Sequence, residues 1–239
     1  MKKNIAVIGA AGDVGQGVVD QLLQAGHRVI AVGRNAEKLE KLSTRLTARG
    51  QLDIVVGSVE NEATAAALLA QIRELAPQLD GVVVSVNAPL EIKPLVDVDS
   101  TQLTQVLQAN LVTHLIAAKT FVPALAPAGL YLGIGGGMAD LIMPGFGMNS
   151  ICQAAQRNMY RALAEELKDR GVRVQELMLY SMIAGASNRD KAHPKWITDD
   201  DVGRHVVAVI DNPAWFPEPI ITLKSRKDAG LQPATASAS

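Results

Sequence analysis

The chain begins with an apolar run that ends in a loop of closely spaced glycines. Residues 5–8 have the composition of a buried strand, and Gly9, Gly12 and Gly15 follow before an amphipathic segment. Glycines permit a tight turn, and the unpaired N–H groups at the start of a helix attract an anion. This order predicts a phosphate-binding turn of the kind that holds a dinucleotide. The alternative is an ordinary strand-to-helix turn with a positive φ at Gly9 or Gly12.

Short β-branched runs alternate with longer amphipathic segments along the chain. The predicted strands are 5–8, 28–32, 53–56, 81–86, 129–134, 172–179 and 219–223. The predicted helices are 14–25, 37–48, 62–75, 101–122, 149–170 and 199–210. This alternation predicts a Rossmann-type, doubly wound α/β fold, with about seven parallel strands and helices on both faces of the sheet.

Composition limits the partners. The 239 residues carry a formal net charge of −1, so the chain has no basic field for nucleic acid or an anionic membrane. The single cysteine, Cys152, excludes an intrachain disulfide and a cysteine-rich metal site, and we expect no metal. We expect a cytoplasmic protein that acts on a small molecule. One domain should span residues 1–224, and a flexible C-terminal tail should span residues 225–239.

Several short motifs follow one another in an order that is specific when they are taken together. They are the glycine loop, Asn87-Ala88, Asn110, Pro144-Gly145, Leu163-Ala164-Glu165-Glu166-Leu167 and Gly171-Val172-Arg173-Val174. On these residues the chain resembles the short-chain dehydrogenase/reductase family over residues 4–224. The resemblance implies the same fold and a dinucleotide cofactor. It also implies a homodimer or homotetramer packed through the helices at 101–122 and 149–170.

The same resemblance implies that the catalytic residues of the family are missing. The family's tyrosine and lysine fall on Asn149 and Gln153, and its serine falls on Gly136. Amides do not titrate near neutral pH, and glycine has no hydroxyl group to polarise a carbonyl. Asn110 is the one member of the family's catalytic tetrad that is kept.

We therefore name Asn110, Asp140 and Tyr180 as the candidate catalytic residues. Asp140 follows the serine position by four residues, and Tyr180 follows the sixth strand. Each of these two has a structural alternative, since Asp140 could cap a turn and Tyr180 could be a packing residue with a satisfied hydroxyl. His114, one turn after Asn110, is a further candidate whose alternative is a hydrogen-bonded core histidine.

The cofactor residues implied by the resemblance are kept more fully. They are Gly9, Ala11, Gly12, Asp13, Val14, Gly15, Gly33, Arg34, Asn35, Ser58, Val59, Asn87, Ala88 and Gln153. An acidic residue at the end of the second strand suits NAD, whereas an arginine suits the 2′-phosphate of NADP. Because Arg34 stands there, we expect NADP(H) rather than NAD(H). The alternative is that Arg34 is a solvated loop charge.

Three functions are compatible with this pattern. The first is an atypical NADP(H)-dependent oxidoreductase that acts on a small apolar or conjugated carbonyl, imine or quinone without the Ser-Tyr-Lys site. The second is a non-catalytic dinucleotide-binding sensor or partner subunit. The third is a non-redox lyase or isomerase on the same scaffold, with Asp140 and His114 as an acid–base pair.

Overall fold

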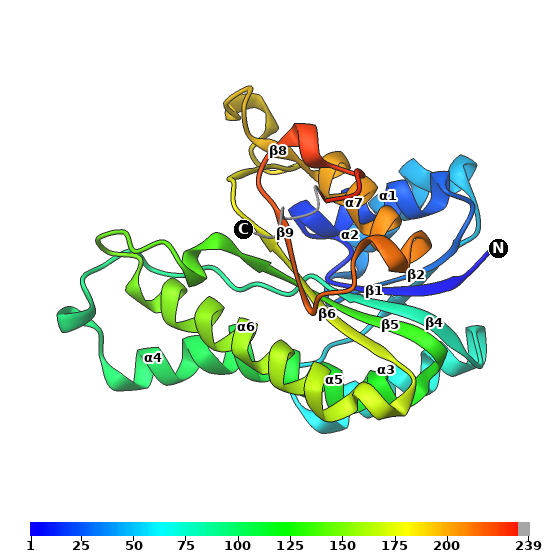
Figure 1. Cartoon of the computed structure of the whole chain (residues 1–239), viewed down its shortest axis with the longest axis horizontal. Coiled ribbons are helices and arrows are strands. Elements are labelled where there is room, and N and C mark those ends of the chain that lie inside the picture. Colours follow the sequence, from blue (N-terminus) through cyan, green and yellow to red (C-terminus); the bar gives the residue numbers. More distant parts are fainter. Residues whose placement is uncertain (234–239) are drawn as a thin grey trace, which may run out of the picture.

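Seven parallel strands form the centre of the computed structural model, which describes residues 1–233 (Figure 1). The strands are β1 (Asn4–Ile8), β2 (Arg28–Gly33), β3 (Leu52–Val56), β4 (Leu79–Val84), β5 (Leu125–Gly136), β6 (Arg173–Leu179) and β9 (Ile220–Leu223). Their order across the sheet is β3-β2-β1-β4-β5-β6-β9, and every neighbouring pair is parallel. The chain changes direction across the sheet between β1 and β4, and ligands of such folds bind outside the carboxyl ends of the strands at this switch point.

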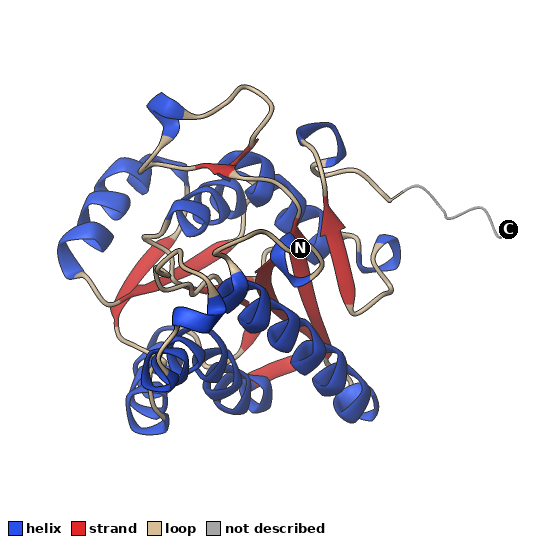
Figure 2. Cartoon of the chain, turned by 90° about the vertical axis from the view of Figure 1, so that its left-hand side faces the viewer, coloured by secondary structure: helices blue, strands red, loops and turns tan. Residues whose placement is uncertain are grey.

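Helices cover both faces of the sheet. One face carries α1 (Asp13–Gln24), α2 (Ala36–Leu46) and α7 (Asp199–Asp211). The other face carries α3 (Glu62–Leu75), α5 (Thr113–Phe121) and α6 (Gly147–Leu167). Two hydrophobic clusters, one on each face, join these helices to the buried strands. Figure 2 shows the strands between the two helical layers, and the Rossmann-type fold predicted from the sequence is confirmed.

The helix predicted for residues 101–122 is interrupted. It consists of α4 (Ser100–Leu107), a π-helical turn over Gln108–Val112, and α5. Asn110 lies in that turn, where its Oδ1 accepts a hydrogen bond from the Ala88 N–H at 2.7 Å and its Nδ2 donates to the Val106 carbonyl at 3.1 Å. The π-helical turn thus fixes the loop that follows β4.

Two short strands were not predicted. β7 (Ile183–Ala184) and β8 (Ile197–Thr198) pair with each other outside the main sheet. Strands of two residues are too short for any hydrophobic period to identify. Among the helices of residues 1–233, none is both long enough and apolar enough to cross a membrane.

The first part of the predicted C-terminal tail contacts α7. Arg226 pairs with the buried Asp201, with 2.9 Å between Nε and Oδ2, and the Gly230 N–H donates to His205 Nδ1 at 3.2 Å. Residues 234–239 of the predicted tail lie outside the described residues.

Two glycines set the separation of α1 and α7. A Cβ atom on Gly17 would overlap the main chain of Asp199, and one on Gly203 would overlap the carbonyl oxygen of Gly17. The main chains of the two helices therefore lie closer together than they could if either position carried a side chain.

We expect Gly17→Ala to lower the free energy of unfolding by about 1–3 kcal/mol, because the added methyl group forces the packed helices apart. Helix propensity by itself predicts the opposite sign, a gain of about 1 kcal/mol for alanine over glycine. Urea denaturation would measure the change, with Thr44→Ala at an exposed position of α2 as the control. A gain in stability for Gly17→Ala would contradict the steric account.

Candidate functional site

Two adjoining cavities lie at the carboxyl ends of the strands. The larger has a volume of about 720 Å³ and the smaller about 310 Å³. Ser85, Val86 and Asn87, which follow β4, line both. The two cavities therefore adjoin along this segment, and we call the pair the trough; it lies at the switch point of the sheet, where a doubly wound fold binds its ligand.

The glycine loop forms one wall of the larger cavity. Gly9 has a φ of +87°, its N–H donates to the Val32 carbonyl at 3.0 Å, and a Cβ atom on it would overlap the carbonyl oxygen of Ser85. Gly12 precedes α1 and has no side chain to cap the helix, which leaves its first N–H groups for an anion. Gly15 lies behind the loop, where a Cβ atom would overlap the Gly9 carbonyl.

Most of the residues predicted to bind the cofactor line the larger cavity. They are Gly9, Ala11, Gly12, Gly33, Arg34, Asn35, Ser58, Val59, Asn87 and Ala88. Val14 and Gln153 line the smaller cavity instead, and Asn87 lines both. Asp13 and Gly15 are not among the lining residues of either cavity.

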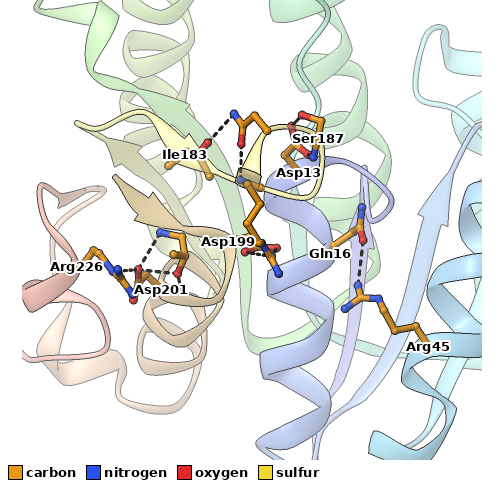
Figure 3. Close-up of polar contacts among 12 residues, drawn as sticks. Asp13, Gln16, Arg45, Ile183, Ser187, Asp199, Asp201 and Arg226 are labelled. Atoms are coloured by element: carbon orange, nitrogen blue, oxygen red, sulfur yellow. Dashed lines mark hydrogen bonds and ion pairs between the residues drawn. The ribbon is translucent and has the colours of Figure 1, made fainter. Parts of the chain in front are cut away.

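The carboxylate of Asp13 faces the segment between β7 and β8 (Figure 3). It accepts hydrogen bonds from the main-chain N–H and the hydroxyl of Ser187, at 2.8 and 2.5 Å. Farther along the segment, Arg189 Nη2 lies 2.7 and 2.9 Å from the two oxygens of Asp199, the first residue of α7. The segment is thereby fastened to the first residues of both α1 and α7.

Arg34 lies at the end of the larger cavity that β2 and α2 form. Asn35 caps α2 by accepting from the Lys38 N–H at 2.9 Å, and Lys38 also lines the cavity. Sequence reasoning missed Lys38, although its position four residues after Arg34, in the first turn of the predicted helix, was a usable signal. Glu60 is the acidic residue among the described lining residues of this cavity.

Amide side chains dominate the polar lining of the smaller cavity. They belong to Asn87, Asn110, Asn149, Gln153 and Gln156.

Cys152 is the one titratable side chain among the described residues that line this smaller cavity, and burial raises the pKa of its thiol. Amides neither take nor release a proton near neutral pH. The described lining therefore contains no group suited to general acid–base catalysis at that pH.

Asp140 and Tyr180 are brought together, but they do not line the smaller cavity as Asn110 does. The Tyr180 hydroxyl donates to Asp140 Oδ2, and Arg157 Nη1 lies 2.5 Å from Asp140 Oδ1. The Arg157 hydrogen bond holds the pKa of Asp140 below its usual value, whereas burial and the hydrogen bond to Asp140 raise the pKa of Tyr180. Neither residue lines either cavity. The Tyr180 hydroxyl is satisfied, as its structural alternative expects, whereas the Asp140 carboxylate binds two side chains and does not cap a turn.

His114 is a fully buried core histidine. Its Nε2 lies 3.0 Å from the Val86 carbonyl, which can only accept, so Nε2 carries the hydrogen and Nδ1 accepts from the Tyr160 hydroxyl at 3.1 Å. Burial lowers the pKa of His114 to about 4, so the ring is neutral at pH 7. His114 and Asp140 therefore have separate partners and do not form an acid–base pair.

A run of glycines at the end of β5 makes room for polar side chains. A Cβ atom on Gly133 would overlap Tyr160, and one on Gly135 would overlap Glu176. A Cβ atom on Gly136 would lie 2.7 Å from Gln153 Oε1, and one on Gly137 would lie 2.7 Å from the Tyr180 ring. Gln153 thus fills the space that a side chain at position 136 would need. Its Oε1 is buried and has no hydrogen-bond partner among the described residues.

Glu176 and Gln156 are polar residues that the sequence analysis did not single out. Glu176 lies on β6 and is fully buried, and burial raises its pKa to about 8. Gln156 Nε2 donates to Glu176 Oε1 at 2.8 Å and to the Ile134 carbonyl at 3.0 Å. A glutamate inside an apolar strand segment was the signal available in the sequence.

Comparisons with known proteins agree with this architecture. The model of the short chain dehydrogenase family matches residues 3–193. A curated relative, the rhamnolipids biosynthesis 3-oxoacyl-[acyl-carrier-protein] reductase of Pseudomonas aeruginosa, is 30% identical over 123 residues. That match covers 50% of this chain and 46% of the relative, so it spans less than half of the relative's length.

Solved structures extend the similarity to nearly the whole chain. A short-chain type dehydrogenase/reductase from Mycobacterium ulcerans is 22% identical with a TM-score of 0.83, covering 92% of this chain and 87% of that one. A short-chain dehydrogenase/reductase from Serratia marcescens is 16% identical with a TM-score of 0.82, covering 92% and 96%. At these identities the structures show a shared fold.

The burial of Glu176 makes the stability of the protein depend on pH. The folded protein keeps this proton up to about pH 8, whereas an unfolded glutamate releases it near pH 4.5. The folded state thus binds more protons in that window, and the free energy of unfolding falls as the pH rises, by at most about 1.4 kcal/mol per pH unit.

Glu176→Gln is neutral throughout, so we expect the stability of this variant relative to the wild type to increase from pH 5 to pH 8. Urea denaturation at several pH values would measure it, with Glu74→Gln, an exposed change on α3, as the control. Parallel pH profiles for Glu176→Gln and the wild type would show that Glu176 is ionised in the fold.

Proposed function

Since the chain belongs to the short-chain dehydrogenase/reductase family, whose members are NAD(P)-dependent oxidoreductases, we propose that it transfers hydride between NADP(H) and a small apolar or conjugated carbonyl, imine or quinone. The observation that carries this proposal is that the two cavities adjoin at the switch point of the sheet. The larger one begins at the glycine loop and α1, and it meets the smaller one along Ser85–Asn87. A dinucleotide bound along this trough would have its phosphates at the start of α1.

The charges near α2 support NADP(H) over NAD(H). Arg34 and Lys38 line the same end of the larger cavity, and the capped start of α2 adds its dipole. A 2′-phosphate carries about two negative charges, for which a guanidinium and an ammonium group are suitable partners. Glu60 lines the same cavity, and its negative charge opposes the binding of a phosphate group.

Polar atoms of the smaller cavity fit the ribose and nicotinamide half of a dinucleotide. Gln153 Oε1 is a buried acceptor without a partner, and a ribose hydroxyl can donate to it. Asn110 accepts a hydrogen bond from the Ala88 N–H and so holds the residue that follows the shared wall Ser85–Asn87. When NADPH is bound, it supplies the hydride, while these residues position the reacting groups.

The absence of an acid among the described lining residues of the smaller cavity supports the substrate class. Reduction of an ordinary ketone needs a proton at the developing alkoxide, and no side chain lining this cavity is suited to give it. A quinone or a conjugated imine spreads the added charge, so its reduced form can take a proton from water. Such substrates suit an active site made of amides.

The same observation favours a second candidate function, a dinucleotide-binding protein without catalytic activity. In that case the trough would serve as a sensor site or as part of a complex with another enzyme. Measurement of turnover separates the two candidates.

We also propose that copies of the chain associate through α4, α5 and α6, as the family resemblance implies. Leu115 on α5 and Ile151 on α6 support this, since both are apolar and more than a third exposed.

In a single-turnover experiment, we expect the protein to oxidise bound NADPH in the presence of a quinone or a conjugated imine and not with an aliphatic ketone. Loss of the NADPH absorbance would be the measurement. Tight binding of NADPH without oxidation by any substrate class would contradict the reductase and support the second candidate. Absence of NADPH binding would contradict both.

Arg34→Ala should weaken NADPH binding by about tenfold or more, with little effect on NADH, because a charge-assisted contact to the 2′-phosphate is lost. Lys38→Ala should have a smaller effect in the same direction. Lys41→Ala is a matched control, since Lys41 is exposed on α2 and pairs with Glu37. Titration of cofactor fluorescence would give the affinities. An equal loss for NADPH and NADH would place the Arg34 contact away from the 2′-phosphate.

A further inference from the structure

One amide in the wall of the smaller cavity has a fixed orientation. Gln156 lies on α6 one turn after Gln153, is 5% exposed, and lines that cavity. The Ile134 carbonyl can only accept a hydrogen bond, so the Gln156 atom 3.0 Å from it must be the nitrogen. The same nitrogen lies 2.8 Å from Glu176 Oε1. Both amide hydrogens are therefore used inside the protein.

The oxygen of this amide is left for the cavity. Within residues 1–233, no donor forms a hydrogen bond with Gln156 Oε1. Gln153, one turn earlier on α6, provides a second acceptor without a partner, its Oε1. Much of the remaining lining is apolar, including Ile134, Met138 and Met182. This part of the cavity thus offers acceptors within an apolar surface.

Glu176 helps the Ile134 carbonyl to keep Gln156 in this orientation. Its side chain occupies the space beside Gly135, where a Cβ atom would overlap Oε1. The groups that influence its ionisation are Gln156, which donates to it, and Arg157, whose charge favours the carboxylate, yet burial outweighs both and raises its pKa to about 8. Oε1 accepts from Gln156 whether the acid is neutral or ionised, so a change of pH does not reverse the amide.

We propose that Gln156 is a specificity-determining residue that selects substrates bearing a hydroxyl or N–H group beside the reacting carbon, with Glu176 as its positioning residue. This inference rests on the proposed function. A substrate with a donor there forms a hydrogen bond to Gln156 Oε1. A substrate with a methyl group at the same place leaves that oxygen without a partner and loses the contribution of the bond.

Two ketones of nearly equal size test this preference. α-Hydroxyacetophenone and propiophenone differ in having a hydroxyl or a methyl group on the carbon next to the carbonyl. Calorimetry would measure the dissociation constant of each for the full-length protein saturated with NADP⁺, so that no turnover is needed. We expect the hydroxyketone to bind about 3- to 10-fold more tightly, which is the effect of one net hydrogen bond.

Variants identify the residue responsible. Gln156→Leu should bring the ratio of the two dissociation constants to about one, because the acceptor is gone. Glu176→Leu should reduce the ratio without bringing it to one, because the Gln156 nitrogen loses one of its two acceptors and keeps the Ile134 carbonyl. Glu176→Gln should restore it, since its side-chain oxygen accepts from Gln156 as the acid does. Each ratio is taken within one variant, so a general loss of folded protein affects both ketones equally.

Equal affinity for the two ketones, binding of neither, or a preference that survives Gln156→Leu would overturn the inference. NADP⁺ binding is measured first in every variant, which separates the two proposals. Cofactor binding without discrimination between the ketones removes the role of Gln156 and leaves the proposed function in place. A wild-type protein that binds no NADP⁺ removes the proposed function itself.

Discussion

The switch point of the sheet is held together by main-chain segments that pack against each other. They lie so close that no Cβ atom would fit between them. At Gly9 the loop after β1 lies against the loop after β4, and at Gly17 α1 lies against the first residue of α7. Both contacts involve the segment that runs from β1 into α1, so the start of that helix is placed from two sides. The trough follows from this arrangement, because its shared wall, Ser85–Asn87, is the segment that Gly9 touches.

Glycines also shape the opposite wall of the smaller cavity. Their role there is to leave space for other side chains, and not to adopt a special backbone conformation. Along the end of β5, Gly133, Gly135, Gly136 and Gly137 each admit a polar side chain from another element. Tyr160 joins the buried histidine, Glu176 orients Gln156, and Tyr180 joins Asp140 and Arg157. The polar groups near this wall are thus held mainly by one another. The exceptions are the side-chain oxygens of Gln153 and Gln156 and the second carboxyl oxygen of Glu176, Oε2.

Hydrophobic period and turn residues were enough to predict the seven main strands and both helical layers, because long buried elements leave a repeating pattern. The order of the motifs was enough to establish the family. Tertiary contacts were not predictable in the same way. No local pattern shows that Asp140 and Tyr180 meet each other outside the cavities. Glu176 was not predicted as a site residue, because hydrophobic periodicity assigns it to a strand but does not show that its carboxyl group is buried.

The glycine run also restricts how the site can change during evolution. A serine at position 136 meets the side chain of Gln153, and any larger residue at position 135 meets Glu176. A replacement at either glycine therefore requires the end of its partner side chain to move. At position 136 the group that must move is the amide of Gln153, so a hydroxyl placed there would displace a side chain that lines the smaller cavity.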